Sequence, residues 1–186
     1  MAHELRTTTI ETPIGPLVAI ATPRGLCVLE FQRDERLSLQ SAYLRRWYPG
    51  MTRGEGGNAH LDDTRTWLAR YFAGRFGALD APALDIRGTA FELAVWRAMR
   101  EVAIGSVSTY AALAERVGNP RGARAVGAAS GRNPVCIIVP CHRIVGSNGS
   151  LVGYGGGLGT KRRLLEHEGA IPSLLPGTRG FSPAAV

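Results

Sequence analysis

The first 31 residues alternate between short β-rich runs and turn-forming segments. Residues 5–10, 17–21 and 26–31 are rich in apolar and β-branched side chains, and proline and glycine stand in both intervals between them. Runs of this length, separated by turns that contain Pro and Gly, are typical of adjacent antiparallel strands. The pattern therefore predicts a three-stranded antiparallel sheet at the start of the chain.

The pattern then changes to a helical period. Residues 36–48 and 60–76 carry apolar side chains at intervals of three and four, which predicts two amphipathic helices. The polar, glycine-rich residues 52–58 between them predict a loop, and residues 77–87 predict a linker. Residues 1–87 contain no arrangement that resembles a catalytic site, so we expect them to form a supporting α/β domain with its linker.

Two short helices joined by a tight turn are predicted in the second half of the chain. Thr89 and Glu92 have the spacing of a capping box and start the helix that precedes this pair. Ser108 or Thr109 caps the next helix, and residues 121–131 continue the helical pattern after a glycine-containing turn. These last two helices make a helix-turn-helix candidate.

The second helix of this pair consists mostly of Gly, Ala and Ser. Each glycine lowers helix stability by about 1 kcal/mol relative to alanine, so local propensity does not explain the composition. Close approach of another backbone, from a protein helix or from nucleic acid, does explain it. Arg124 is the one long side chain near the middle, and it could reach into a groove or a base stack.

The apolar run 137–145 contains Pro140-Cys141-His142-Arg143. Its apolar arms predict that the cysteine is buried. The imidazole and guanidinium neighbours favour the thiolate, which is the nucleophilic form of cysteine. The alternative is that Cys141 is a small core residue, as most cysteines outside disulfides are.

The flanking segments predict turns and one more helix. Asn133-Pro134 breaks the chain before the apolar run, and residues 146–149 predict the turn of a hairpin after it. The glycine-rich residues 152–157 predict a mobile pocket wall with one aromatic side chain. Residues 161–167 predict a final helix.

The positive charge is concentrated around the same cysteine. The net charge is +7, and residues 116–165 hold eight of the 22 Lys and Arg residues and none of the 15 Asp and Glu residues. A local field of one sign attracts polyanions, nucleic acid first. Phosphate metabolites, a membrane surface and a plain solvated face are the alternatives.

The cysteines and the N-terminus indicate the compartment. Cys27, Cys136 and Cys141 are spaced neither as a disulfide framework nor as a zinc site. The N-terminus lacks a signal-peptide pattern, and no apolar run approaches the ~18 residues of a membrane span. We expect a cytoplasmic protein that binds no membrane, no metal and no cofactor.

Five motifs within residues 88–169 together resemble the O6-alkylguanine-DNA alkyltransferases, the methylated-DNA–protein-cysteine methyltransferases. The motifs are Pro140-Cys141-His142-Arg143, Asn133-Pro134, the 121–131 helix, the glycine run at 153–157 and His167-Glu168-Gly169. The resemblance implies an α/β (α+β) fold with a ribonuclease-H-like N-terminal domain. A mostly helical, winged-helix-like domain with a helix-turn-helix would follow. The expected bounds are 1–87, 88–170 and a flexible tail at 171–186.

The resemblance also implies DNA repair by direct reversal of damage. Cys141 would take the alkyl group from O6-alkylguanine, and also from O4-alkylthymine, once and irreversibly, as a suicide enzyme. His142 would act as the base through a water, Glu168 would orient it, Asn133 would hold the loop, and Tyr110 would donate to the leaving guanine. The implied base pocket consists of Tyr110, Pro140, Val145, Tyr154, Gly155 and Gly156.

The implied partner is double-stranded DNA with an alkylated guanine, bound by a monomer through its minor groove. The target base must be flipped out, at a cost of a few kcal/mol. Arg124 would fill the vacated stack. The implied DNA-binding residues are Arg124, Arg121, Ala123, Ala125, Ser130 and Arg132.

Three other functions compete with this one. A binding-only relative would lack the acceptor cysteine, which is present here as Cys141. A helix-turn-helix regulator would not need the buried thiol that we expect. A cysteine hydrolase would turn over many times.

Overall fold

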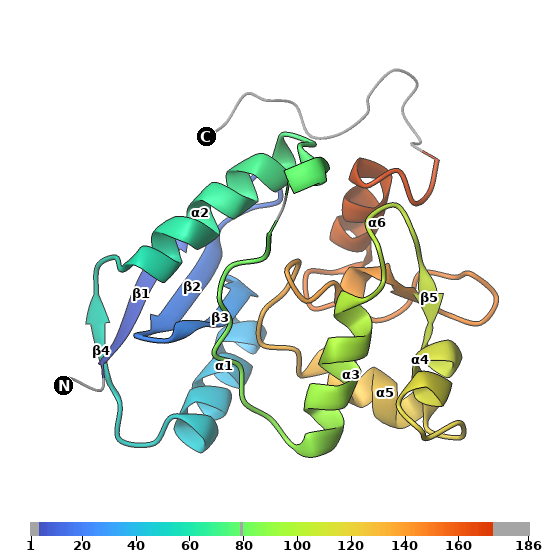
Figure 1. Cartoon of the computed structure of the whole chain (residues 1–186), viewed down its shortest axis with the longest axis horizontal. Helices are drawn as coiled ribbons and strands as arrows, with labels where there is room; N and C mark the ends of the chain where they lie inside the picture. Colours follow the sequence, from blue (N-terminus) through green and yellow to red (C-terminus); the bar gives the residue numbers. More distant parts are fainter. Residues whose placement is uncertain (1–3, 79, 173–186) are drawn as a thin grey trace. The chain divides into compact units, whose positions relative to one another are not determined.

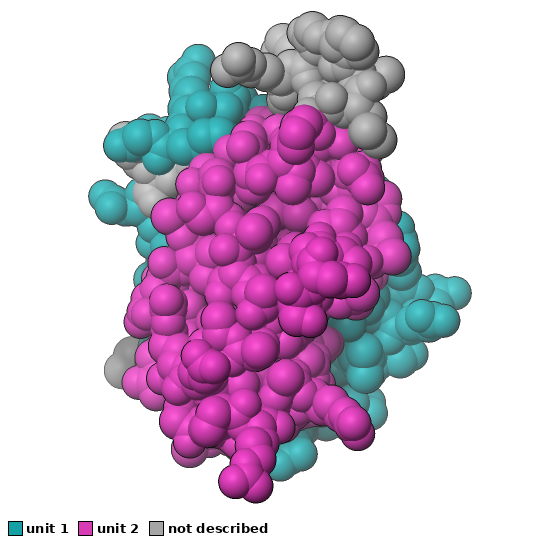
Figure 2. Space-filling view, turned by 90° about the vertical axis from the view of Figure 1, so that its right-hand side faces the viewer, with its two compact units in different colours: residues 1–87, 182–186 teal, residues 88–181 magenta. Residues whose placement is uncertain are grey.

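The computed structural model describes residues 4–78 and 80–172. These residues form two compact units, one that ends at Arg87 and one that begins at Gly88, coloured separately in Figure 2. The predicted tail at 171–186 lies outside the described residues from position 173 onward. In the described ranges, no helix has both the length and the apolar character needed to cross a membrane.

A four-stranded mixed sheet is the centre of the first unit, in the order β3-β2-β1-β4 (Figure 1). The strands β1 (Glu4–Ile10), β2 (Leu17–Thr22) and β3 (Gly25–Phe31) form the antiparallel sheet that the sequence predicts. The fourth strand, β4 (Thr52–Glu55), pairs in parallel with β1. The prediction of a loop over 52–58 is therefore wrong for residues 52–55. This edge strand carries mostly exposed polar side chains, so it lacks the apolar alternation that reveals a strand.

Two helices pack on this sheet, α1 (Asp34–Trp47) and α2 (Ala59–Phe72). All positions of β2 and β3 are buried, so both faces of these strands are covered. Residues of α1 pack against a cluster on one face that includes Leu5, Val18 and Ile20, and α2 also contacts β2 and β3.

The second helix is shorter than the sequence predicts. It ends at Phe72 rather than at residue 76, because Gly74 adopts a left-handed φ of 71° directly after it. A short 3-10 turn, η1 (Phe76–Ala78), follows.

The segment predicted as a linker is anchored to the first unit. The Leu26 N–H donates to the Ala83 carbonyl at 2.8 Å, and the Asp85 N–H donates to the Leu26 carbonyl at 2.9 Å. The Asp85 carboxylate also accepts hydrogen bonds from the Thr22 hydroxyl at 2.8 Å and from Arg24 at 3.0 Å. The chain therefore leaves the first unit from a fixed point.

The second unit is mostly helical. Its α3 begins at the predicted capping box: the Glu92 N–H donates to Thr89 Oγ1 at 3.2 Å, and the Glu92 side chain accepts from the Thr89 N–H at 2.8 Å. Thr109, rather than Ser108, caps α4. The elements in chain order are α3 (Ala90–Arg100), β5 (Ser108–Thr109), α4 (Tyr110–Arg116), α5 (Ala123–Gly131), η2 (Cys141–Arg143), β6 (Ile144–Val145) and α6 (Leu158–His167).

The two short strands of this unit pair in parallel, β5 with β6. A turn at Gly146–Gly149 does form, since the Gly149 N–H donates to the Gly146 carbonyl at 2.9 Å. The prediction of a hairpin there is nevertheless wrong, because β6 pairs with a strand more than thirty residues earlier rather than with the segment after the turn. Turn chemistry identifies a turn, but it does not identify the partner of a strand.

Candidate functional site

Cys141 is the first residue of η2 and follows Pro140 directly. It is 8% exposed, and the side chain of Asn133 holds it from one side. The Asn133 Nδ2 donates to Cys141 Sγ at 3.3 Å and to the Val139 carbonyl at 2.8 Å, while its Oδ1 accepts from the Val135 N–H at 3.0 Å. One amide thus fixes both ends of the loop that leads to the sulfur.

The backbone of this loop is strained at Ile137. Its φ is 68°, and no other non-glycine residue in the described ranges has a positive φ. A left-handed conformation of a β-branched residue costs on the order of 1–3 kcal/mol. The Ile137 side chain is buried, and the Val139 N–H donates to the Val135 carbonyl at 3.0 Å across the loop. Packing and hydrogen bonds therefore impose this conformation on the segment between Asn133 and Cys141.

His142 forms a buried pair with Glu168. Its Nε2 lies 2.9 Å from Glu168 Oε1, and neither side chain is exposed. A carboxylate only accepts hydrogen bonds, so Nε2 carries the hydrogen and Nδ1 carries the lone pair. Burial lowers the pKa of His142, which keeps the imidazole neutral near pH 7. Nδ1 is buried and has no hydrogen-bond partner among the described residues, so it can accept a proton.

Arg143 holds the other side of Glu168. Its Nε donates to Glu168 Oε2 at 2.8 Å and its Nη2 to Oε1 at 2.9 Å, while Nη1 donates to the Val102 carbonyl at 2.6 Å. Burial alone raises the pKa of Glu168, but the contacts with His142 and Arg143 outweigh it and hold that pKa at about 2. Glu168 is therefore ionised and fixed in orientation.

A buried lysine links β6 to the glycine-rich loop. Lys161 is fully buried, and its Nζ donates to the carbonyls of Ile144 at 2.5 Å, Val152 at 2.6 Å and Gly153 at 3.4 Å. Burial lowers the pKa of Lys161 to about 8, and the charge of Cys141 offsets part of this effect. The glycine run is thus tied to the strand that directly follows η2.

The sequence analysis treated Arg143 as a guanidinium neighbour that favours the Cys141 thiolate, gave Lys161 no role in the site, and counted both in a basic segment for DNA. That assignment is wrong for these two residues, because Arg143 is 6% exposed and Lys161 is 0% exposed. A charge count along the chain carries no information on side-chain direction. The signal that could have found them is the apolar sequence around Arg143 and the two leucines that follow Lys161 at helical spacing.

Tyr110, the first residue of α4, points toward the glycine-rich loop. Its hydroxyl donates to the Val152 carbonyl at 3.4 Å, the same oxygen that Lys161 binds. Burial and the charge of Cys141 raise the pKa of Tyr110, and a hydrogen bond with Ser130 lowers it. The net shift is upward, so the phenol keeps its proton at neutral pH and can donate it.

The other predicted pocket residues lie on the segments around η2. Pro140 and Val145 are buried on its two sides, and Val145 pairs with the residue before Tyr110. The Tyr154 ring packs edge-on near His142, with centroids 6.2 Å apart. Gly155 and Gly156 form the turn after Tyr154. No group of three His, Cys, Asp or Glu side chains in the described part of the chain is arranged to hold a metal ion.

The helix α5 presents small side chains and arginines to solvent. Arg121, Arg124, Ala125 and Arg132 are exposed, and Ala123 is half-buried. Ser130 is different: it is 8% exposed and lies with Val126 and Ala129 on the buried side of α5, so its burial does not favour its predicted DNA contact.

Two contacts fasten α5 to α3. The Trp96 indole N–H donates to the Ala129 carbonyl at 2.9 Å, and the Arg132 Nε donates to Glu92 Oε1 at 2.5 Å. Glu92 uses its other oxygen for the α3 capping box. Arg132 therefore already has a carboxylate partner on the protein, whereas Arg124 has no hydrogen bond or ion pair with the described residues.

Two family models cover most of the chain. Residues 5–86 match the ribonuclease-like domain of 6-O-methylguanine DNA methyltransferase, and residues 90–170 match its DNA binding domain. The architecture predicted from the sequence, a ribonuclease-like α/β unit followed by a helical DNA-binding unit, is thereby confirmed.

Individual relatives are similar over nearly their whole length. The methylated-DNA–protein-cysteine methyltransferase of Salmonella typhimurium is 42% identical over 87% of this chain and 94% of its own. The solved structure of Mycobacterium tuberculosis OGT in complex with DNA is 38% identical, with a TM-score of 0.73 over 90% of this chain and 93% of that one. The O6-methylguanine-DNA methyltransferase of Pyrococcus kodakaraensis is 25% identical, with a TM-score of 0.65 over 89% of this chain and 99% of that one.

Proposed function

Because the chain belongs to the 6-O-methylguanine DNA methyltransferase family, we propose that Cys141 is the cysteine on which its activity depends. The chain binds DNA and repairs O6-methylguanine by moving the methyl group to one of its own cysteines. The observation that supports Cys141 is its neighbourhood. An amide donor contacts its sulfur, and the next residue is a neutral histidine with a buried proton acceptor.

The other two cysteines fit the role less well. Cys27 lies in the first unit, donates its S–H to the Ile20 carbonyl at 3.2 Å, and has a pKa that burial raises to about 12. It therefore stays a thiol, which is a weak nucleophile. Cys136 is 3% exposed within the strained loop, where its backbone carbonyl accepts from the Ile138 N–H at 2.8 Å. We assign both to packing.

The transfer is one displacement at the methyl carbon. The Cys141 proton passes through a water to His142 Nδ1, and Glu168 stabilises the imidazolium that forms. The Cys141 thiolate attacks the methyl carbon, the carbon–oxygen bond to guanine breaks, and its electron pair stays on the base. The Asn133 amide stabilises the thiolate before attack, because hydrogen bonds to an ionised acceptor are the stronger ones.

The leaving guanine needs a proton or a hydrogen bond, and Tyr110 is the donor that we assign to it. Its raised pKa keeps the phenol protonated at neutral pH. Lys161 acts as a positioning residue, because it holds the loop at Val152 and Gly153 against the strand after η2. The product is a thioether, which water does not displace, so the reaction stops after one methyl group.

The base must leave the helix to reach Cys141. We assign Arg124 to the vacated stack, because it is exposed on a helix of small side chains that can approach a narrow groove closely. The assignments of Arg121, Ala123, Ala125 and Arg132 to DNA contacts stay predictions. The same holds for repair of O4-alkylthymine, for binding as a monomer, and for a cytoplasmic location.

The reaction class is tested by its stoichiometry. Incubation with excess duplex that carries O6-methylguanine should add at most one methyl group per chain, and peptide mapping should locate it on Cys141. Intact-mass spectrometry before and after incubation measures both. More demethylated base than protein would identify a hydrolase, and a methyl group on Cys27 or Cys136 would overturn the assignment of the acceptor.

Arg124→Ala should separate base flipping from chemistry. We expect the rate on duplex DNA to fall by about tenfold or more, since an unfilled stack leaves a flipping cost of a few kcal/mol uncompensated. The rate with free O6-benzylguanine should stay within about twofold, because no flipping is needed. Single-turnover kinetics with both substrates measures the ratio. Arg97→Ala, an exposed arginine on α3, is the control, and equal losses on both substrates would remove Arg124 from this role.

A further inference from the structure

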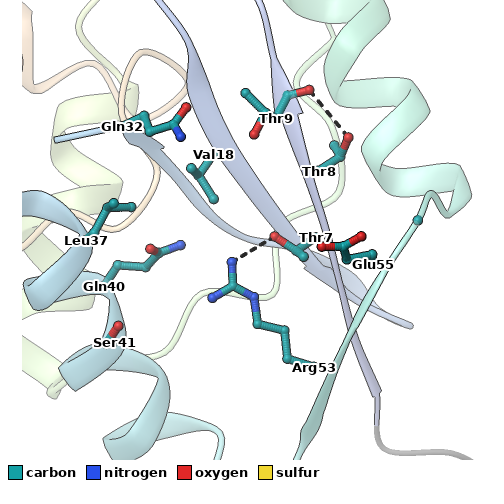
Figure 3. A pocket seen from close by; sticks show the side chains of 11 residues that line it. Thr7, Thr8, Thr9, Val18, Gln32, Leu37, Gln40, Ser41, Arg53 and Glu55 are labelled. Atoms are coloured by element: carbon teal, nitrogen blue, oxygen red, sulfur yellow. Dashed lines mark hydrogen bonds between the residues drawn. The ribbon is translucent and has the colours of Figure 1, made fainter. Parts of the chain in front are cut away.

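A polar groove of about 650 Å³ lies in the first unit, between α1 and the sheet (Figure 3). The groove exists because the face of the sheet that packs against α1 changes from apolar to polar along the strands. Leu5 and Ile20 pack under α1, whereas Thr7 and Thr9 occupy the positions on β1 that continue the side of Leu5. Hydroxyl groups thus form the floor where a helix would otherwise cover apolar side chains.

Gln40 supplies a buried donor to this groove. It is 6% exposed, and its Nε2 is buried with no hydrogen-bond partner among the described residues. Figure 3 shows its amide directed from α1 into the groove, toward the side on which Thr7 and Arg53 lie. A buried donor without an acceptor destabilises a fold by about 1–3 kcal/mol, so a ligand atom that accepts from it would be favoured.

Arg53 supplies the charge. Its Nη2 donates to Thr7 Oγ1 at 3.0 Å, and within the described ranges it has no carboxylate partner. Most of its five donors are therefore available. Glu55 also lines the groove, but in Figure 3 its carboxylate lies on the side of Thr7 away from Gln40. The nearby Arg6 is already engaged, by Glu4 at 2.9 Å and by the Glu55 carbonyl at 3.0 Å.

We propose that this groove binds a phosphate group, with the Arg53 guanidinium and the Gln40 amide donating to its oxygens. A guanidinium matches the oxygens of a phosphate with two parallel hydrogen bonds. The hydroxyls of Thr7 and Ser41, which also line the groove, can complete the shell. The groove is larger than one phosphate, which leaves room for the nucleoside or the strand attached to it. The phosphate belongs either to a free nucleotide or to nucleic acid.

The test is a titration of the full chain in which the NMR signals of the Gln40 side-chain amide and of Arg53 Nε–H are monitored. Inorganic phosphate is added against chloride at constant ionic strength, and saturable shifts at these two groups are expected. Arg53→Gln should weaken binding by about tenfold or more, the loss expected for a hydrogen-bonded charge. Arg65→Gln is the matched control, because Arg65 is an exposed arginine of the same unit that pairs with Asp62.

Gln40→Leu gives a second, independent readout. It should raise the midpoint of thermal unfolding, because it removes a buried donor without a partner, and it should weaken phosphate binding severalfold. Glu55→Gln should leave binding unchanged or strengthen it, because it removes a negative charge. Absence of saturable shifts in the parent chain, an unchanged affinity in Arg53→Gln, or loss of binding in Glu55→Gln would each overturn the proposal.

The source of the phosphate is distinguished by two further titrations. Shifts of the same signals with a nucleoside monophosphate, but not with unmodified duplex DNA, assign the site to free nucleotides. Shifts with the duplex that persist in Arg124→Ala assign it to a nucleic-acid strand bound independently of α5. Neither titration involves Cys141, so failure of the methyl-transfer mechanism would leave this result intact.

Discussion

Cys141→Ser is expected to lose methyl transfer completely while its affinity for duplex DNA stays within about twofold. The serine hydroxyl can still accept the hydrogen bond from Asn133, so the loop between them keeps its anchor. A hydroxyl ionises far less readily than a thiol and is the weaker nucleophile, so attack on the methyl carbon beside His142 is lost. Transfer of labelled methyl groups and fluorescence anisotropy at one fixed salt concentration measure the two quantities.

Cys136→Ser is the matched control for this experiment. Cys136 is also buried, lies five residues upstream in the same loop, and should be replaceable without loss of the one-to-one stoichiometry. If Cys141→Ser loses duplex binding together with transfer, the thiol has a structural role. If Cys136→Ser loses transfer while Cys141→Ser retains it, the acceptor is misassigned.

Glu168→Gln is expected to slow transfer by at least about a hundredfold and to lower the free energy of unfolding by roughly 3–5 kcal/mol. The substitution leaves the buried Arg143 guanidinium without its carboxylate and removes the charge that stabilises the His142 imidazolium. Denaturant unfolding and single-turnover kinetics measure the two effects. Glu166→Gln, two residues earlier on α6 and 4.0 Å from Arg162, should change neither appreciably.

The lowered pKa of Glu168 determines the direction in which stability changes with pH. Glu168 has a pKa of about 2 in the folded chain, below the ordinary value of a glutamate. Its contribution is therefore fully present above about pH 4.3, the unfolded value, and is lost as the pH falls from there toward 2. The gap corresponds to about 3 kcal/mol. The Gln variant should lack this part of the acid slope, and an unchanged slope would mean that Glu168 is not the ionised centre of the network.

The sequence predicted the parts of the fold whose signals are local. The three antiparallel strands follow from runs rich in β-forming residues. The capping box follows from the three-residue spacing between Thr89 and Glu92. The strand β4 was missed because its pairing with β1 is made by backbone atoms and leaves no apolar pattern. The parallel pairing of β5 with β6 was missed for the same reason.

The residues of the candidate site likewise divide into those that the sequence could indicate and those that it could not. Cys141, His142 and Glu168 could be singled out from their motifs, and the structure brings the histidine and the glutamate into contact. The apolar neighbours of Arg143 and Lys161 could have indicated that both are buried. Their partners could not be predicted, because only the tertiary fold sets the positions of the Val102 and Ile144 carbonyl groups. The burial of Ser130 with Val126 and Ala129 could not be predicted, because small side chains all along α5 give little indication of which side is buried.

One helix, α3, connects α5 with the buried network around Arg143. Trp96, in its second half, holds the last turn of α5 through the Ala129 carbonyl, and Val102, just beyond its end, accepts from Arg143. The helix has 11 residues and is about 16 Å long. It therefore ties α5, which carries Arg124, to the buried Arg143 network beside Cys141. On the roles proposed for Arg124 and Cys141, the distance that a flipped nucleotide travels would be set by this scaffold and not by the lesion.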